Sequence, residues 1–321
     1  MSKWINKDMF NKFVDEKKNE VNEQGGGFGR DFKKIWPTPE KGTDAKPKIY
    51  EGRFLPDNDG NFYNKYFYHM HKVGEKWFYS LCPKTYNMDN FCLLCNLAAK
   101  LYTGSDDDKK LAYQYKRKER YVANFFIEND ERDKDRKDED KVEGTVKLYE
   151  FPAKIESKLR SEVTDKQHGL GLSIFDPSDE GYSFIIKVKS TKPQADGKIW
   201  PDYSDSIFAR KPHAIADNEK KIDTIMKTTH SITEYIASME KSNDDVIKAI
   251  KDEMLWDLVE NDYNRYMKVN KKTIDKEVEE QLDEVWGGNA KNDDEPEEET
   301  PKKSKKESDS DEDILKELEN L

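Results

Sequence analysis

The chain has 321 residues, of which 38% are charged and 34% hydrophobic, so it cannot be one packed domain from end to end. No run approaches the roughly 20 apolar residues needed to span a bilayer, and the first residues lack the apolar stretch of a signal peptide, so we expect a soluble, intracellular protein without a membrane partner. Of the formal net charge of −11, −7 lies in residues 288–321, which contain 13 acidic and 6 basic side chains, and the rest of the chain is nearly balanced.

The N-terminal segment is predicted to be an arm on a hinge. Trp4, Phe10 and Phe13 recur at roughly helical spacing, which favours a short amphipathic helix within residues 1–23. The sequence EQGGGFG at residues 23–29 then breaks this helix with a flexible hinge. An arm on a hinge usually reaches for a partner, and the alternative interpretation is a frayed terminus.

A β-rich region follows, from about residue 48 to residue 210. Its short runs are rich in β-branched and aromatic residues and are separated by Gly, Asn, Asp and Pro, a pattern typical of a small barrel or sandwich. Residues 128–144 interrupt the pattern with charges of both signs and are predicted to form a solvated excursion between two strands. The predicted strands are KIYEGRFL, NKYFYHMHKV, KWFYSL, RYVANFFI, TVKLYEF and YSFIIKVKS.

Helical periodicity characterises residues 217–286. Two apolar faces are predicted, separated by KSNDD, which indicates a break and a helix cap, and both faces are interpreted as packing surface. Residues 288–321 bury too little apolar area to order themselves, but their last leucines would form one apolar stripe if a partner induced a helix. The first face contains Ile222, Ile225, Met226, Ile232, Tyr235, Ile236 and Met239, and the second contains Val246, Ile247, Ile250, Met254, Leu255 and Leu258.

The cysteines of the chain form one cluster. Cys82, Cys92 and Cys95 lie within fourteen positions, and in a reducing compartment such a cluster indicates a metal site and not disulfides. A C-x2-C turn directs two sulfurs at one ion and is a common half of a zinc site. Cys82 adds a third sulfur, and His69 and His71 are the candidates for the fourth ligand. The alternative interpretation is three buried thiols beside a surface histidine.

A predicted β-hairpin selects between the two histidines. If Gly74 and Glu75 are its two-residue loop, His69 is the diagonal neighbour of Cys82. Diagonal neighbours lie about 7–8 Å apart, a distance that two side chains can close around an ion. His71 lies one step further from Cys82. The predicted site is therefore H-x12-C-x9-C-x2-C. Three thiolates and one imidazole complete a tetrahedron and leave no open position, so we expect one structural Zn²⁺. The predicted register pairs Val73 with Lys76, His71 with Phe78, His69 with Ser80 and Phe67 with Cys82.

Residues 113–126, YQYKRKERYVANFF, interleave cations with aromatic rings. Cations neutralise phosphates and flat rings stack on unpaired bases, so this motif favours a single-stranded nucleic acid. The alternative is that these tyrosines pack in the core or at the edge of a β protein. The motif contains Lys116, Arg117, Lys118 and Arg120 among Tyr113, Tyr115 and Tyr121, and further candidates are Arg53, Lys72, Tyr102, Tyr149, Trp200, Tyr203 and Phe208.

Together these features resemble the gene-32-type single-stranded DNA-binding (helix-destabilising) proteins of T-even-like bacteriophages. The resemblance rests on RFLP at 53–56, the ligand spacing from His69 to Cys95 with Trp77 between, KRKERYVAN at 116–124, FIIKVK at 184–189 and the acidic, leucine-ended tail. It implies a mainly β core, an OB-fold with an inserted zinc subdomain, over residues 30–213. A helical region over residues 214–287 and a disordered acidic tail over residues 288–321 would follow.

The resemblance also implies which residues act. His69, Cys82, Cys92 and Cys95 would bind zinc. In the family an N-terminal arm, here residues 1–29, docks on the neighbouring protomer and makes binding cooperative, although MSKWINKDMFNKF lacks the family's compact basic motif. The acidic tail shields the DNA cleft and recruits replication, recombination and repair proteins. The implied DNA contacts are Arg53, Lys72, Lys116, Arg117 and Lys118 as cations, and Tyr102, Tyr121, Tyr149, Tyr203 and Phe208 as rings.

The expected function is sequence-independent, cooperative binding that coats and protects single-stranded DNA in phage replication, recombination and repair, in the cytoplasm of the infected bacterial host. The alternative is a zinc-stabilised adaptor that binds proteins through its helices and tail and no nucleic acid. No enzyme is expected, because the sequence offers no paired carboxylates in a plausible site, no nucleophile with a nearby base and no phosphate-binding glycine loop.

Overall fold

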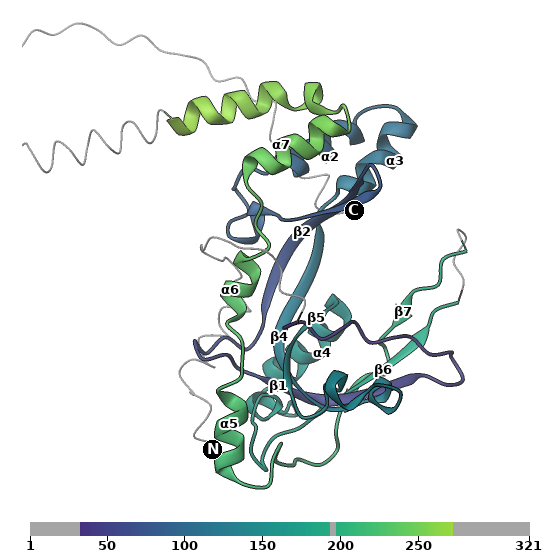
Figure 1. The fold of residues 1–321 in the computed structure, drawn as a ribbon, viewed down its shortest axis with the longest axis vertical. Helices are drawn as coiled ribbons and strands as arrows, with labels where there is room; N and C mark the ends of the chain where they lie inside the picture. Colours follow the sequence, from purple (N-terminus) through teal and green to yellow (C-terminus); the bar gives the residue numbers. More distant parts are fainter. Residues whose placement is uncertain (1–32, 193–196, 272–321) are drawn as a thin grey trace, which may run out of the picture. The chain divides into compact units, whose positions relative to one another are not determined.

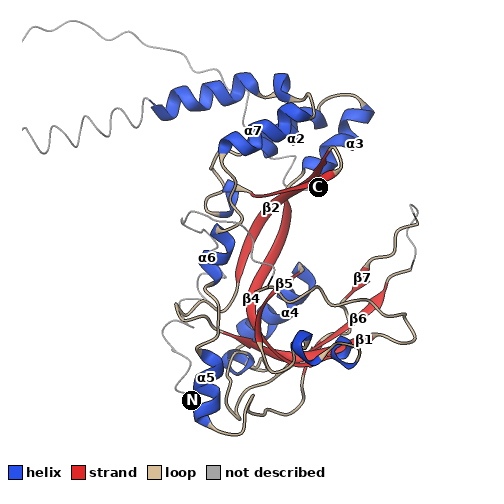
Figure 2. Cartoon of the chain, in the orientation of Figure 1, coloured by secondary structure: helices blue, strands red, loops and turns tan. Residues whose placement is uncertain are grey.

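The computed structural model describes residues 33–192 and 197–271. The predicted arm and hinge at residues 1–29, the predicted tail at residues 288–321 and the end of the predicted helical region lie outside the described residues. The described chain is an antiparallel β core with helices packed on it, as the fold prediction requires (Figures 1 and 2). In these ranges no helix combines the length and apolarity that crossing a bilayer demands.

Within the described ranges, the strands form one sheet in the order β3-β2-β4-β1-β6-β7, with β5 added on β4 and β8 on β6. Every pair of strands is antiparallel, and the six predicted runs are confirmed as β1 to β6. The bounds are β1 (Lys48–Leu55), β2 (Asn64–Val73), β3 (Lys76–Leu81), β4 (Lys118–Asp130), β5 (Val146–Phe151), β6 (Phe184–Ser190), β7 (Pro201–Asp202) and β8 (Ile207–Phe208).

The long strand β4 joins the parts of the sheet. Its first residues pair with β2, its middle with β5 and its last residues with β1. The register of β1 shifts between Glu51 and Gly52, where the two backbones approach closely. A Cβ atom on Gly52 would lie 2.2 Å from the carbonyl oxygen of Phe126, so only glycine fits at this irregularity.

The main apolar cluster of the β core is aromatic. Trp36 stacks on Phe125 at 5.2 Å, and its indole Nε1 donates a 2.9 Å hydrogen bond to the buried carboxylate of Asp130. Arg132 pairs with the same carboxylate at 2.7 Å. Residues 128–144 do connect β4 to β5 as predicted, but they are not simply solvated, because Asp130 and Asp133 are buried and accept hydrogen bonds.

Short helices account for the rest of the described fold. The prediction that KSNDD caps a helix is confirmed, because the Ser242 hydroxyl accepts the backbone N–H of Asp245 at 3.1 Å at the start of α7. The bounds are α2 (Leu93–Tyr102), α3 (Asp106–Tyr115), α4 (Ala153–Thr164), α5 (Glu219–Met226), α6 (Ile232–Ala237) and α7 (Asn243–Asp252), with helical residues also at 260–271. The 3₁₀ turns are η1 (Pro83–Thr85), η2 (Glu131–Lys134), η3 (Asp138–Asp140), η4 (Gly171–Ile174) and η5 (Trp256–Leu258).

The predicted helical faces pack on three different apolar clusters. Ile222 of α5 packs with Leu55 of β1, and Ile236 of α6 packs with Tyr68 of β2. Ile250 of α7 joins a cluster that contains Cys82, Cys92 and the leucines of α2. Met254 differs from the predicted face, because it has a positive φ of 58° and is 90% exposed. We call residues 67–117, which carry the cysteines, the metal lobe, and α7 packs on it (Figure 1).

Candidate metal centre and nucleic-acid interface

The structure brings the four predicted metal ligands together. The predicted hairpin register is confirmed, since His69 pairs with Ser80 and Val73 with Lys76, and the Cys82 N–H donates to the Phe67 carbonyl at 2.9 Å. Cys92 immediately precedes α2, and Cys95 lies in its first turn. The buried face of α2, which includes Leu94 and Leu97, packs in the same apolar cluster as Cys82, and this packing holds the start of the helix beside the end of β3. The positive end of the α2 dipole favours thiolates there.

The distances within this cluster fit a tetrahedral ion. The ligand atoms of His69, Cys82, Cys92 and Cys95 all lie within 4.8 Å of one another. His69 Nε2 is 3.3 Å from the Cys92 sulfur and 3.6 Å from the Cys95 sulfur, which is itself 3.6 Å from the Cys82 sulfur. A tetrahedron with metal–sulfur bonds of about 2.3 Å has edges of about 3.8 Å. This donor set can hold a metal ion, and with four protein ligands it leaves no position for substrate.

The electrostatics of the cluster also favour a cation. Hydrogen bonding to Cys82 is the main cause that raises the pKa of Cys92 and lowers that of Cys95, since sulfurs this close cannot all ionise by themselves. Burial alone would lower the pKa of His69, but its contacts with Cys82 and Cys95 raise it to about 9. His69 Nδ1 lies 2.7 Å from the Tyr115 carbonyl, so Nδ1 donates there and Nε2 is left for a metal.

His71 is next to the cluster but takes no part in it. Its ring is 2% exposed and packs against Tyr115 at 4.5 Å and Phe78 at 5.2 Å. Neither ring nitrogen has a hydrogen-bond partner, and burial, followed by the charge of His69, lowers the pKa of His71 to about 4. His71 is therefore a neutral packing residue, which agrees with the sequence-based choice of His69.

The basic motif lies where α3 ends and β4 begins, at the edge of the metal lobe. Arg117 places its guanidinium 4.9 Å from the ring centroid of Phe67 on β2, and the ammonium of Lys65 lies 5.4 Å from the same centroid. Lys116 is exposed, while Lys118 is half-buried. Burial, and to a smaller extent the positive charge of Arg120, lowers the pKa of Lys118. The motif therefore offers its cations at the junction between the metal lobe and the β core.

Two further predicted DNA contacts lie in the metal lobe and are exposed. Tyr102, at the end of α2, is 37% exposed. Lys72 holds its ammonium 5.7 Å from the ring of its cross-strand partner Trp77, which is 63% exposed. Both side chains are accessible to a strand of nucleic acid without any rearrangement.

Arg53 occupies a different environment. Its side chain is fully buried, and its guanidinium donates to the carbonyl oxygens of Asp176 and His213, the latter at 2.8 Å, and to the Ser183 hydroxyl at 3.1 Å. Burial lowers its pKa to about 10. In this conformation Arg53 has no surface to offer a phosphate and instead ties β1 to the segment after β8.

The aromatic DNA contacts predicted from β4 onwards gather in the main apolar cluster. Tyr121, Tyr149 and Tyr203 are all buried there, and the half-buried Phe208 packs against it. Tyr121 stacks on Phe151 at 5.8 Å and donates its hydroxyl hydrogen to Glu119 at 2.9 Å. Their DNA contacts stay predictions, because in this conformation their ring faces contact protein.

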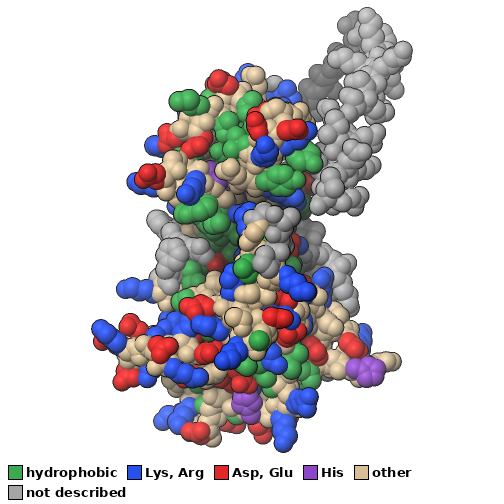
Figure 3. All heavy atoms as spheres, turned by 90° about the vertical axis from the view of Figure 1, so that its right-hand side faces the viewer, with side chains coloured by type: hydrophobic (Ala, Val, Ile, Leu, Met, Phe, Trp, Pro, Cys, Tyr) green, Lys and Arg blue, Asp and Glu red, His purple; other side chains and the backbone are tan. Residues whose placement is uncertain are grey.

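Sequence reasoning missed Lys65 and Phe67. Both precede His69 on β2 at intervals of two residues, so the confirmed hairpin register would have placed all three on one face of the strand. Trp200, one of the further candidates, is 50% exposed after β6 and offers an accessible ring. Figure 3 shows basic and acidic side chains interspersed over one face of the described chain.

Comparison with known protein families agrees with this geometry. A family model described as "gp32 DNA binding protein like" matches residues 52–254, which is more than half of the chain. The match includes the four metal ligands, the basic motif and helices α5 to α7. No curated protein matches the chain. The chain therefore belongs to the gp32-like family of DNA-binding proteins.

Proposed function

We propose that this protein binds single-stranded DNA without sequence preference, through the start of β4 and the facing residues of β2. The family match over residues 52–254 is the observation that carries the proposal. The geometry supports it, because Arg117 and Lys65 provide cations beside accessible rings such as Tyr102. Cations of this kind bind the phosphate backbone, and rings stack on unpaired bases. The match favours this function over a protein adaptor without nucleic acid.

A salt titration tests the proposal. Fluorescence anisotropy of a labelled oligo(dT) should report saturable binding, and the logarithm of the association constant should fall linearly with the logarithm of salt concentration, by about 0.7 per phosphate neutralised on a single strand. A duplex of the same length should bind more weakly, since its bases are not free to stack. Absence of binding at low salt would refute the function, and salt-independent binding would refute an ionic interface.

We propose zinc as the ion held by His69, Cys82, Cys92 and Cys95. Three thiolates and one imidazole suit Zn²⁺, and a bound ion would neutralise the sulfurs and fix the start of α2 beside β3. The ion would have a structural role, since the four ligands come from the protein. Elemental analysis of purified protein should find one zinc per chain, and a different metal or none would overturn the assignment.

The wider roles are proposals that follow from the function. Cooperative binding through residues 1–29, coating of DNA during phage replication, recombination and repair, and recruitment of other proteins by the acidic residues 288–321 all concern segments outside the described residues or partners not present here. The same holds for a location in the cytoplasm of an infected bacterium and for the expected absence of enzymatic activity. Deleting residues 288–321 should tighten DNA binding, most at low salt, if their acids compete with phosphate.

A further inference from the structure

Two adjacent strands connect the metal lobe to the β core. The chain enters the lobe along β2 and leaves it along β4, and these two strands pair with each other over residues 64–68 and 118–122. Within the described chain, residues 118–120 of β4 pair with β2 alone. A two-stranded ribbon twists more strongly than a wide sheet and has no further strands to stiffen it. By itself it would leave the spacing between lobe and core loosely defined.

A third connection runs along this ribbon. Residues 230–241, which we call the strap, contain α6 and lead to α7 beside β2 and β4 (Figure 1). Apolar residues of α6 such as Ile236 pack in one cluster with Tyr68 of β2 and Val122 of β4. The strap therefore lies against both strands of the ribbon where they pass from the core to the lobe.

Hydrogen bonds hold both ends of the strap. At the core end, the backbone N–H of His230 donates to Oδ1 of Asn124 on β4, and Nδ2 of Asn124 donates to the His230 carbonyl, each at 2.8 Å. Asn124 is fully buried and pairs with β1 and β5, so it belongs to the core. At the lobe end, the N–H of Leu81, the last residue of β3, donates to the Met239 carbonyl at 2.9 Å. The strap thus spans the ribbon from core to lobe.

One carboxylate ties the middle of the strap to the ribbon. Oε1 of Glu150 on β5 accepts hydrogen bonds from the hydroxyl groups of Tyr66 at 2.5 Å and Tyr235 at 2.7 Å. Tyr66 belongs to β2 and Tyr235 to α6, and both are buried. Burial, followed by the charge of Glu150, raises the pKa of Tyr66 well above its ordinary value, so its hydroxyl keeps its proton and stays a donor. Glu150 therefore joins three elements at one atom.

A fixed spacing between lobe and core matters for a ligand that contacts both. The exposed ring of Tyr102 lies in the metal lobe, and the exposed ring of Trp200 lies beside β7 in the β core. One strand of DNA can stack on both rings only when lobe and core are at the matching distance. When a binding-competent arrangement is only partly populated, the apparent affinity falls by that fraction. An arrangement that is set before DNA arrives avoids this loss.

We propose that Glu150 is a positioning residue for DNA binding, which locks the strap to the ribbon through Tyr66 and Tyr235 and thereby sets the spacing between the metal lobe and the β core. This inference rests on the proposed function and deepens it. Glu150 acts through the two hydroxyl groups and not by touching DNA. A single strand then meets a preset surface and does not have to align two loosely joined parts.

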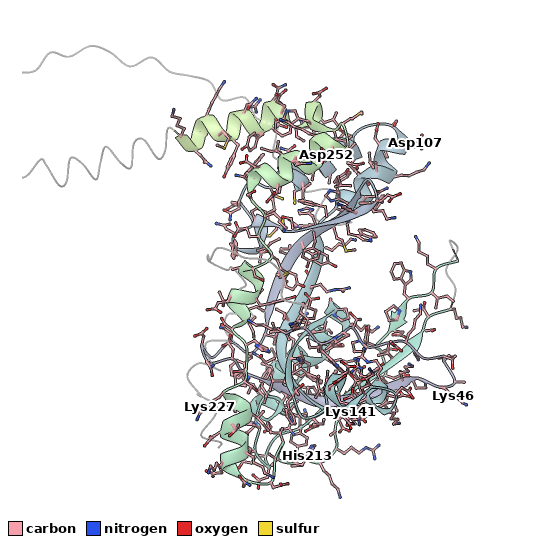
Figure 4. The ribbon with its side chains drawn as sticks, in the orientation of Figure 1. Lys46, Asp107, Lys141, His213, Lys227 and Asp252 are labelled. Atoms are coloured by element: carbon pink, nitrogen blue, oxygen red, sulfur yellow. The ribbon has the colours of Figure 1, made fainter. Side chains whose placement is uncertain are left out.

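Distance measurements between lobe and core test this role directly. Spin labels are attached to keto amino acids introduced in place of Asp107 in the metal lobe and Lys46 just before β1, so that the cysteines stay unmodified. Both positions are exposed and are labelled in Figure 4. Pulsed electron paramagnetic resonance on the full chain should give one narrow distance distribution, which oligo(dT) leaves unchanged. Tyr235→Phe and Glu150→Ala should broaden this distribution, and oligo(dT) should narrow it again.

The same variants should bind labelled oligo(dT) more weakly, by an amount that follows from their distance distributions. If the competent spacing falls to about a third to a tenth of the population, the apparent Kd rises about three- to tenfold. The dependence of affinity on salt should keep its wild-type slope, because no cation is removed. The double variant should bind no more weakly than Glu150→Ala, since both substitutions break the same contact.

Two controls separate positioning from general stability. Tyr63→Phe removes another buried tyrosine hydroxyl, which donates to Glu156 of α4 at 3.3 Å in the β core, and it should change neither the distance distribution nor the affinity. Glu150→Gln keeps an oxygen to which both hydroxyl groups can donate, so it should behave like the wild type. Metal content and melting temperature are measured for every variant and should stay near the wild-type values in Tyr235→Phe.

Specific results would overturn the role of Glu150. Wild-type distributions in both Tyr235→Phe and Glu150→Ala would show that the contact does not set the spacing. Broadening without loss of affinity would show that the spacing does not limit binding, and equal weakening in Tyr63→Phe would reduce the effect to core stability. In each of these cases, a wild type that binds oligo(dT) leaves the proposed function standing. A wild type that binds no oligo(dT) would overturn the function, and the positioning role with it.

Discussion

The β core and the metal lobe are stabilised by different means. Of the 20 buried residues in the main cluster of the β core, 12 are aromatic, and each of these rings buries a large area. The apolar cluster through which α7 packs on the metal lobe has 11 buried residues, of which Tyr115 is the one aromatic and Cys82 and Cys92 are candidate ligands. A small cluster with few large side chains needs a further constraint, such as a bound ion. We therefore expect that a substitution which unfolds one of the two regions leaves the other folded.

Removing a metal ligand should produce the largest effect, and it should be confined to the metal lobe. His69→Ala opens a site whose ion contributes on the order of 10 kcal/mol in small metal modules. We expect loss of bound metal and of amide protection in α2 and β3, with β5 and β6 still protected, as measured by elemental analysis and hydrogen exchange. His71→Leu is the matched control and should keep the metal, because neither ring nitrogen of His71 makes a hydrogen bond.

Breaking the buried ion pair should destabilise the β core instead. Asp130→Ala removes the acceptor of the Trp36 indole and the carboxylate partner of Arg132, which should lower the free energy of unfolding by about 3–5 kcal/mol. Denaturant unfolding would measure this loss, and metal content should stay at the wild-type value. Simultaneous loss of metal would contradict the independence of the two regions.

The same carboxylate should make the stability of the β core sensitive to acid. Burial alone would raise the pKa of Asp130, but hydrogen bonds from Arg132 and Trp36 hold it below the ordinary value. A lowered folded-state pKa contributes stability that is present above the unfolded pKa of about 3.9 and is lost as the pH falls through the folded pKa. The stability difference between the wild type and Asp130→Asn should therefore shrink below about pH 4. A constant difference down to pH 2 would contradict this linkage.

Substituting an exposed aromatic ring should weaken DNA binding, whereas substituting a buried ring should lower folding stability. Trp200→Ala should weaken oligo(dT) binding by about 1–3 kcal/mol, if the ring stacks on a base, with an unchanged melting temperature. Tyr149→Ala, in contrast, removes a ring that is 1% exposed and should cost about 3–5 kcal/mol of folding stability. Native stability in Tyr149→Ala would argue that this ring is not part of the core.

The smallest expected effect concerns a helix cap in the metal lobe. The Ser105 hydroxyl accepts the Asp108 N–H, and the Asp108 carboxylate accepts the Ser105 N–H at 2.9 Å, which forms a capping box at the start of α3. Ser105→Ala should cost about 1 kcal/mol and should increase hydrogen exchange in α3 alone. An equal increase in β6 would mean that the lobe and the β core unfold together.

Local patterns in the sequence predicted the elements of this protein. Runs rich in β-branched and aromatic residues delimited β1, β2 and β3 to the residue, and a two-residue loop at Gly74 and Glu75 determined the register that brings His69 to Cys82. These predictions succeeded because the period of a strand and the geometry of a short hairpin are set by the residues themselves. The local sequence KSNDD likewise predicted the helix cap that the structure has at Ser242.

Only the tertiary structure decided which side chains are available to a ligand. Arg53 and Tyr149 look like DNA contacts in the sequence, yet they are buried, while Phe67 lies beside Arg117, which is about fifty residues away in the chain. The sequence by itself determined strands, register and metal ligands, since each depends on neighbours along the chain. Exposure and the pairing of cations with rings depend on which distant strands meet, and no local pattern specifies that.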